Sequence, residues 1–196
     1  NINLRCGSTS PELIQATVSG VHADVGIALD GDGDRLVMVD HLGRIADGDQ
    51  LLYVIASDRK RAGTLQGPVV GTVMSNLGLE QKLQSEGVEF LRAKVGDRYV
   101  LAMLKEHGGV LGGETSGHLL CLDRTTTGDG LVSALEVLAV MKRTGRPHAE
   151  LVAGMPKFPQ VMINVRVRER IDPSRSPVIQ DAVRRVEEGL GSSGRV

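Results

Sequence analysis

The sequence has few aromatic side chains: Phe, Trp and Tyr make up 2% of its 196 residues, and Trp is absent. The core must therefore be built from the aliphatic residues of a chain that is 41% hydrophobic. Scarce aromatics argue against a stacking platform for single-stranded nucleic acid. The 23 basic and 24 acidic residues nearly cancel, so the charge indicates neither a nucleic-acid partner nor an anionic membrane surface.

Cysteines and long apolar runs are scarce as well. Cys6 and Cys121 are far apart, and neither lies in a CxxC motif. A disulfide framework is therefore not predicted, and a reducing cytoplasm fits best. The apolar stretches are too short to span a bilayer, and no signal peptide is recognisable. Walker, dinucleotide-binding and zinc motifs are also missing.

Strand and helix patterns alternate over residues 46–152, which predicts an α/β domain. Its expected helices are 49–61, with Asp49 as the N-cap, and then 77–87, 97–107 and 130–144. Its expected strands are 68–73, 88–93, 110–111 and 119–122. The four histidines outside the motifs described below show no ligand spacing: His22, His41, His107 and His148.

The segments on either side of this domain have simpler patterns. A short helix over 11–20 and two strands, 25–29 and 36–40, are expected before it. After it, residues 153–159 read as a linker with two prolines. The alternating residues 161–167 predict a strand, and the apolar spacing over 178–189 predicts a helix.

An acidic, glycine-rich loop is the first motif with clear chemistry. Asp30, Asp32 and Asp34 alternate with two glycines and are followed by Arg35. Glycine allows the backbone to fold tightly enough for the three carboxylates to converge. Their repulsion is relieved by a hard cation such as Mg²⁺. An arginine beside a divalent ion is expected where both hold a phosphate, and an ion pair within the loop is the alternative.

Two simpler interpretations of this loop fit less well. Asp-Gly is an ordinary turn signal, but a plain turn does not need three alternating aspartates. An EF-hand also begins with alternating acidic residues, yet it needs Gly at its sixth position and Glu at its twelfth. Here those positions hold Arg35 and His41, and strands rather than helices are expected on both sides. The pattern favours a metal site between strands.

The second motif is residues 112–118, Gly-Gly-Glu-Thr-Ser-Gly-His. Glu114, Ser116 and His118 place a carboxylate, a hydroxyl and an imidazole among small residues. Such a set can bind the vicinal hydroxyls of a sugar. By itself the motif is ambiguous, because a single Glu or His in a glycine-rich loop is more often solvated.

Together the two loops resemble those of the α-D-phosphohexomutase superfamily. Its DGDGDR metal loop matches residues 30–35, and its GExSGH sugar-recognition loop matches residues 113–118, in the same order and at a similar separation. The resemblance spans essentially the whole chain. Finer motifs resemble the branch that acts on a hexosamine phosphate more than the branch that acts on mannose and glucose phosphates: residues 6–9, 73–79, 93–100 and 125–130.

The resemblance implies α/β domains with mixed sheets and an internal fragment of a four-domain enzyme. Residues 1–45 would end the second domain, 46–152 would form the third, and 158–196 would begin the fourth. Because residues 1–45 lack the early strands of their domain, apolar sheet edges would be unpaired. We therefore expect residues 46–152 to be the most compact unit, with less ordered ends.

The resemblance also implies a reaction. Members of the superfamily interconvert a hexose 6-phosphate and a hexose 1-phosphate through a phosphoserine and a bisphosphorylated sugar. For the hexosamine branch, the reaction lies on the route to UDP-N-acetylglucosamine and the cell wall. The family's serine loop and its Arg-x-Ser-Gly-Thr phosphate loop do not occur in this sequence. We therefore expect negligible turnover by this chain alone.

Roles for individual residues follow from the same resemblance. Mg²⁺ is expected on Asp30, Asp32 and Asp34, and Arg35 is the expected catalytic contact to the transferring phosphate. The sugar is expected to bind Glu114, Ser116 and His118, with Lys94 and Arg98 as further candidates that ordinary surface charge explains equally well. The alternatives are a mutase acting on mannose or glucose phosphates and a non-catalytic module that binds sugar phosphate or metal.

Overall fold

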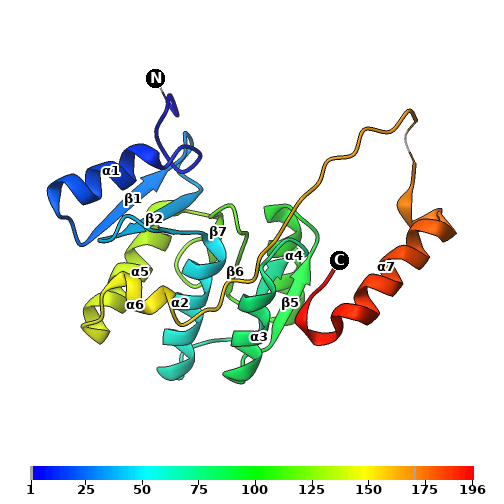
Figure 1. Ribbon diagram of the computed structural model, residues 1–196. Helices are drawn as coiled ribbons and strands as arrows, with labels where there is room; N and C mark the ends of the chain where they lie inside the picture. The colour runs from blue at the N-terminus through cyan, green and yellow to red at the C-terminus, as the bar shows by residue number, and fades with distance from the viewer. Residues whose placement is uncertain (1, 170) are drawn as a thin grey trace. The chain divides into compact units, whose positions relative to one another are not determined.

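The computed structural model describes residues 2–169 and 171–196 of the chain (Figure 1). These residues form two compact units, Asn1–Lys157 and Phe158–Val196, which are described separately. The first unit extends beyond the expected domain of residues 46–152 at both ends, because the N-terminal residues pack into the same unit.

A three-stranded antiparallel sheet, β1 (Val25–Leu29), β2 (Leu36–Asp40) and β3 (Ile45–Ala46), begins the first unit. Helix α1 (Glu12–Val21) packs against β1 and β2. All five residues of β2 are buried, because α1 and a later helix both contact this strand. This burial ties the N-terminal segment to the rest of the unit.

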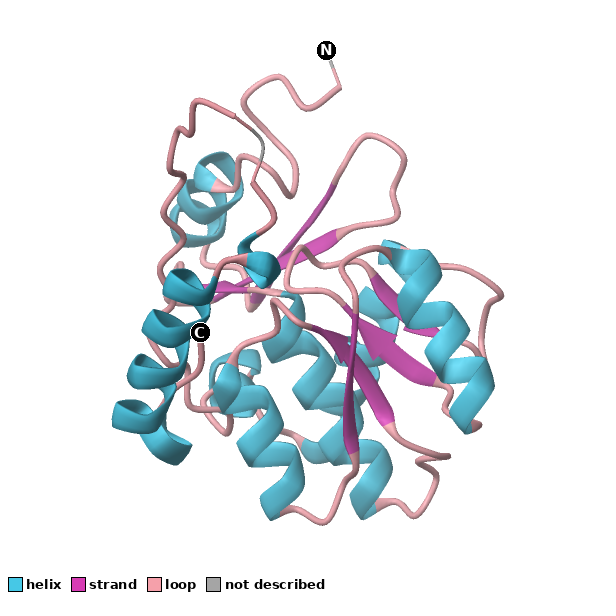
Figure 2. Ribbon diagram, turned by 90° about the vertical axis from the view of Figure 1, so that its right-hand side faces the viewer, coloured by secondary structure: helices cyan, strands magenta, loops and turns pink. Residues whose placement is uncertain are grey.

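A four-stranded mixed sheet forms the centre of the unit, as the fold class predicted (Figure 2). Strands β4 (Val69–Thr72), β5 (Phe90–Ala93) and β6 (Leu111–Gly113) are parallel, and β7 (Leu119–Cys121) pairs antiparallel with β6. The strand order is β5-β4-β6-β7. The glycine-rich motif of residues 112–118 comprises the last two residues of β6 and the short β6–β7 connection, so the antiparallel turn places residues 114–118 at the end of the sheet.

Helices cover both faces of this sheet. Helices α2 (Gly48–Arg61), α3 (Leu77–Ser85) and α5 (Gly130–Thr144) share one apolar cluster with Val69. Helix α4 (Asp97–His107) shares another cluster with Val70. Neighbouring residues of a strand point to opposite faces, so Val69 and Val70 belong to different cores. The largest fully buried side chains of α2 each stabilise the fold by about 1.5–3 kcal/mol; they are Leu51, Leu52 and Ile55.

The start of α2 corrects the predicted N-cap. Asp47, not Asp49, caps the helix: its side chain accepts a hydrogen bond from the backbone N–H of Gln50, whose own side chain accepts one from the N–H of Asp47. This reciprocal arrangement satisfies two backbone donors that the first turn leaves free. Asp49 lies inside the helix with its side chain fully buried.

The end of the first unit also differs from the prediction. Helix α6 (His148–Val152) was not expected, and the linker predicted over 153–159 contains a core residue. Met155 is 3% exposed and belongs to the larger apolar cluster. Lys157, the last residue of the unit, forms an ion pair with Asp47 at 2.5 Å. Buried contacts therefore continue beyond the point at which the two prolines suggested a linker.

The second unit contains helix α7 (Pro177–Leu190) and two short 3₁₀ helices, Pro173–Arg175 and Gly191–Ser193. The predicted helix over 178–189 is confirmed. The strand predicted over 161–167 is wrong, since the described residues show no strand there. No residue of α7 is buried. None of the described helices is both long and apolar enough to cross a membrane.

Candidate functional site

The acidic loop lies between β1 and β2, as the sequence predicted. Asp30, Asp32 and Asp34 each offer one carboxylate oxygen, and these oxygens lie within 4.8 Å of one another. The backbone N–H of Arg35 donates to Asp30 Oδ1 at 3.1 Å. Arg35 Nε lies 3.6 Å from Asp30 Oδ2 and 4.0 Å from Asp34 Oδ1, so the ion pair within the loop is present. The Arg35 side chain is still 48% exposed and can reach a ligand.

The pKa values of Asp30 and Asp34 are shifted in opposite directions. Burial opposes ionisation of Asp30, but the backbone N–H and guanidinium of Arg35 outweigh it, so the pKa of Asp30 lies below its ordinary value. Burial raises the pKa of Asp34, and the carboxylates of Asp30 and Asp32 raise it further against the lowering effect of His118. The repulsion among the three carboxylates therefore makes ionisation less favourable at Asp34.

The loop passes a simple test for a divalent cation. Asp34 Oδ1 is buried and has no hydrogen-bond partner among the described residues. A buried carboxylate oxygen without a partner costs free energy. An ion bound to one oxygen each of Asp30, Asp32 and Asp34 would remove that cost and the repulsion between the carboxylates. The oxygen-only donor set fits Mg²⁺.

The structure places the second motif directly against the acidic loop. Arg35 and His118 form an antiparallel β-bridge, and the N–H of Leu36 donates to Gly117 O at 3.0 Å. His118 Nδ1 lies 3.0 Å from Asp34 Oδ2. Gly117 has a φ of +94°, and a Cβ there would lie 2.0 Å from Leu36 O. Only glycine therefore allows this approach of the two loops.

The sugar-loop candidates have different exposures. Ser116 is exposed and Glu114 is half-buried. His118 is 5% exposed, and its Nε2 has no hydrogen-bond partner among the described residues. A Cβ at Gly128 would lie 2.2 Å from this nitrogen, so the backbone of residue 128 closes over the imidazole. In this conformation His118 faces Asp34 rather than solvent.

Glu114 links the sugar loop to the two basic candidates. Its Oε1 accepts a hydrogen bond from the N–H of Gly96 at 2.8 Å, between Lys94 and Arg98 in the sequence. Both basic side chains are exposed and lie over the Tyr99 ring, Lys94 Nζ at 6.0 Å and Arg98 Cζ at 4.6 Å from its centroid. The hydrogen bond between Gly96 and Glu114 therefore holds the segment that carries Lys94 and Arg98 against the sugar loop.

The buried Asp49 of α2 holds the sugar loop through a hydrogen bond to Thr115. Its Oδ2 accepts hydrogen bonds from Thr115 Oγ1 and from the backbone N–H of Asn76, both at 2.8 Å. Burial raises the pKa of Asp49 against these two hydrogen bonds. Gly48 N donates to Thr115 O at 3.1 Å, so the first turn of α2 holds the same loop through its backbone. The sequence offered no signal for this role, because an Asp at a helix start reads as a cap.

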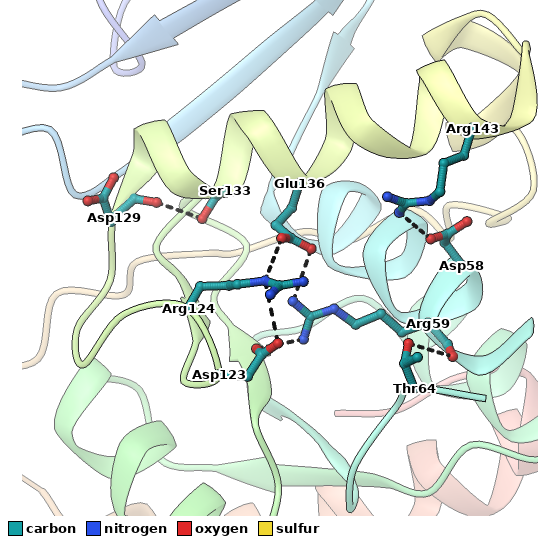
Figure 3. A network of polar contacts seen from close by, with 9 residues as sticks. All are labelled: Asp58, Arg59, Thr64, Asp123, Arg124, Asp129, Ser133, Glu136 and Arg143. Carbon is teal, nitrogen blue, oxygen red and sulfur yellow. Dashed lines mark hydrogen bonds and ion pairs between the residues drawn. The ribbon is translucent and has the colours of Figure 1, made fainter. Parts of the chain in front are cut away.

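An ion-pair network anchors the segment that closes over His118 (Figure 3). Arg59 of α2 is 5% exposed and donates to Asp123 at 2.9 Å and to Glu136 at 3.0 Å. Arg124 donates to Glu136 at 2.9 Å. Asp129 caps α5 by accepting from the N–H of Val132. The segment between β7 and α5 is therefore fixed at both ends, which places Gly128 against the imidazole.

Helix α5 also contacts the acidic loop. The N–H of Gly130 donates to Gly33 O at 2.9 Å. A Cβ at Gly130 would lie 2.9 Å from that oxygen and 3.0 Å from Arg35 O. Residues 125–130 also form one of the motifs that resemble the hexosamine branch. Gly128 allows the backbone to approach the sugar loop, and Gly130 allows it to approach the acidic loop.

Comparisons with known proteins show which family the chain is similar to. The chain is 58% identical over all its 196 residues to phosphoglucosamine mutase of Methylococcus capsulatus, and it covers 44% of that protein's length. A phosphoglucomutase/phosphomannomutase family protein of Burkholderia thailandensis is 31% identical, with a TM-score of 0.69 over 76% of this chain and 32% of that one.

A more distant structure shares the fold. N-acetylphosphoglucosamine mutase of Aspergillus fumigatus, in complex with GlcNAc-6P and magnesium, is 19% identical with a TM-score of 0.72 over 95% of this chain and 49% of that one. Residues 47–158 match the family described as phosphoglucomutase/phosphomannomutase, alpha/beta/alpha domain III. Since this match covers more than half of the chain, the protein belongs to the phosphoglucomutase/phosphomannomutase family of α-D-phosphohexomutases.

Proposed function

We propose that this chain is the metal- and sugar-binding part of a phosphoglucosamine mutase, which interconverts glucosamine 6-phosphate and glucosamine 1-phosphate. One observation carries the proposal: the Asp34–His118 contact and the Arg35–His118 bridge join the acidic loop to the sugar loop. The 58% identity to the Methylococcus capsulatus phosphoglucosamine mutase supports the choice of a hexosamine phosphate over mannose or glucose phosphates.

The three aspartates are the proposed ligands of Mg²⁺. One oxygen each of Asp30, Asp32 and Asp34 would hold the ion, which when bound supplies Lewis acidity toward a phosphoryl oxygen. Asp34 uses its other oxygen to accept from His118. This second contact orients the ligand, as is usual for metal-binding side chains.

The cationic and polar side chains around the ion hold the substrate. Arg35 is half exposed beside the aspartates, so its guanidinium can hold a phosphate that also contacts the ion. Glu114 and Ser116 are the accessible groups for sugar hydroxyls, and the exposed Lys94 and Arg98, which lie two residues on either side of the Gly96 that binds Glu114, are further candidates for substrate contacts. We assign His118 to positioning Asp34, because its ring is buried between Asp34 and Gly128.

Metal binding can be tested on the chain itself by thermal unfolding with increasing Mg²⁺. A ligand at 100 times its dissociation constant stabilises the folded state by about 2.7 kcal/mol. We expect a saturable rise in Tm that is lost in Asp30→Asn and Asp34→Asn. Asp24→Asn, an exposed residue just before β1, is the matched control and should keep the rise. An equal rise in all variants would contradict the assignment.

Turnover can be tested in a chimera, because the chain aligns with the Methylococcus capsulatus enzyme over its whole length. This chain replaces the matching segment of that enzyme, whose remaining residues complete the protein. We expect the chimera to interconvert glucosamine phosphates with a higher kcat/KM than mannose or glucose phosphates, and the isolated chain to show no measurable turnover. A folded chimera that prefers mannose 6-phosphate would point to the other branch, and one that binds Mg²⁺ without turnover would point to a binding module.

A further inference from the structure

A pocket of about 370 Å³ lies beside the C-terminal half of α2, away from the candidate site. Its lining comes from α2, from the end of α3 and from the two ends of α6, and these helices lie side by side (Figure 1). The first turn of α2 contacts the sugar loop at Gly48, whereas the pocket is lined by residues as far along the helix as Arg61. The part of α2 that lines the pocket begins at Tyr53, five residues or about 7.5 Å along the helix from Gly48. The pocket shares no lining residue with either functional loop, so it is a separate site.

The pocket is cationic although the whole chain carries a net charge of −1. Lys60, Arg61 and Arg146 line it, with Glu86 as the one acidic residue of the lining. Glu86 is already satisfied: it accepts from Ser57 Oγ at 2.5 Å and from Tyr53 Oη at 3.1 Å.

Lys82 adds a further partner to this carboxylate, with its Nζ 3.0 Å from Glu86 Oε1. These three interactions leave Glu86 little capacity to neutralise other cations. The side chains of Tyr53 and Ser57 are at the same time held in place, so the polar wall of the pocket is already organised. The positive charge of the remaining lining is therefore available to a ligand.

The three basic side chains keep donors free for such a ligand. Lys60 Nζ donates to Gly87 O at 2.8 Å, which uses one of its three N–H groups. Arg61 lies 4.0 Å from Asp58 Oδ1, while the other oxygen of Asp58 accepts from Arg143 at 2.5 Å. The ion pair of Arg61 is therefore long, and its guanidinium is mostly uncommitted.

Arg146 contacts Glu150 through only part of its guanidinium, at 3.4 Å to Oε2 and 3.1 Å to the backbone oxygen. Its side chain is 44% exposed. Two guanidinium groups and an ammonium group suit a tetrahedral oxyanion, because guanidinium binds phosphate oxygens through paired N–H donors. Beside these cations the pocket offers Val54, Leu151 and the ring of Tyr53. These groups suit an apolar substituent on the anion.

We infer that this pocket binds a small organic phosphate, with the phosphate on Lys60, Arg61 and Arg146 and its apolar substituent on Val54 and Leu151. The volume is within the range of pockets that hold small molecules. The site is independent of the proposed mutase reaction, since it shares no residue with the loops that carry it.

Tyr53 allows a direct test, because the sequence has two tyrosines and no tryptophan. In a Tyr99→Phe background, Tyr53 is the remaining source of tyrosine fluorescence. The chain is titrated with n-butyl phosphate, with inorganic phosphate and with n-butanol. We expect a saturable change in fluorescence with butyl phosphate, weaker binding of inorganic phosphate, and no response to butanol. Absence of a saturable change with butyl phosphate would overturn the inference.

Variants separate this pocket from the candidate site. The double variant Lys60→Gln/Arg146→Gln should lower the affinity for butyl phosphate at least 10-fold, the loss expected for about 1.4 kcal/mol. Arg35→Gln at the candidate site and Arg166→Gln in the second unit are matched controls that should keep it. Arg61→Glu, at an exposed position, tests the same phosphate contact by reversing the charge, and circular dichroism verifies that the variant is folded. Equal affinity in the double variant, or loss of binding in Arg35→Gln, would contradict the assignment.

Discussion

The helices of the two units differ in how many of their residues are buried. Helix α5 of the first unit buries five of its residues and contacts α2 and β7, whereas α7 of the second unit has 14 residues and buries none. Both helices have apolar residues at helical spacing, and both end at glycine. Periodicity is therefore enough to predict a helix, but it does not show whether the apolar face has a partner within the chain.

The same contrast holds for strands. Strand β2 is buried throughout because α1, α5 and two neighbouring strands contact it. Residues 161–167 are also rich in apolar side chains, but Val161, Ile163 and Val165 are at least 75% exposed. A strand needs hydrogen-bonding partners from elsewhere in the chain, so the pattern alone does not produce one. The two functional loops lie in the unit that supplies such partners.

Hydrogen exchange should give the largest difference between the units. Amides in the middle of α5 should exchange only through global unfolding, and those of α7 through local opening, because short helices without tertiary contacts are marginally stable. We expect protection to differ by at least about 4 kcal/mol, which is roughly a thousandfold in rate. Exchange of the isolated chain, read by NMR or mass spectrometry, measures this. Equal protection of α5 and α7 would show that the two units do not differ in local stability.

Gly117→Ala should disrupt the contact on which the first unit's site depends. The new Cβ would meet Leu36 O at 2.0 Å, at a φ that side chains disfavour. Moving β2 away from the sugar loop should cost at least about 3 kcal/mol in the free energy of unfolding. Urea denaturation measures this loss.

Gly145→Ala is the matched control for this substitution. Gly145 also has a positive φ, of +67°, but nothing lies within 4 Å of a Cβ there. Only backbone strain should remain, at about 1 kcal/mol. Equal losses in the two variants would mean that the close approach of the two loops contributes little.

The buried His148 should make the first unit sensitive to acid. It is fully buried with no hydrogen-bond partner on either ring nitrogen among the described residues, and burial lowers its pKa to about 4 against the opposing field of Asp40. The unfolded state therefore takes up the proton first. Its contribution to stability is complete above about pH 6.5 and falls as the pH drops toward 4, by up to about 3 kcal/mol.

Denaturation of His148→Leu at several pH values isolates this contribution, since the nearby carboxyl groups are present in both proteins. The variant should lose less stability than the original chain between pH 6.5 and 4. His107→Leu, at an exposed position, is the control and should follow the original chain. A pH dependence in His148→Leu that matches the original chain would refute this role of the histidine.

Local pattern was enough for several features of the molecule. The strands on both sides of the acidic loop, the helix over 130–144 and the alternating α/β order are confirmed, because each depends on the spacing of apolar residues within one segment. The convergence of Asp30, Asp32 and Asp34 also follows from local glycine spacing, and the structure places their oxygens together. The metal and sugar roles of the two loops stay predictions.

Contacts between distant segments decided the rest. Asp49 resembled a helix cap, but the N-cap is Asp47, two residues earlier, and Asp49 accepts a hydrogen bond from Thr115 instead. His118 was predicted to contact the sugar from its motif alone, which gave no sign that its ring lies between the backbone at Gly128 and the carboxylate of Asp34. The sequence by itself determined which chemical groups the loops carry and how each loop folds. The tertiary structure alone decided which of those groups face each other or solvent, because that depends on packing between residues far apart in the chain.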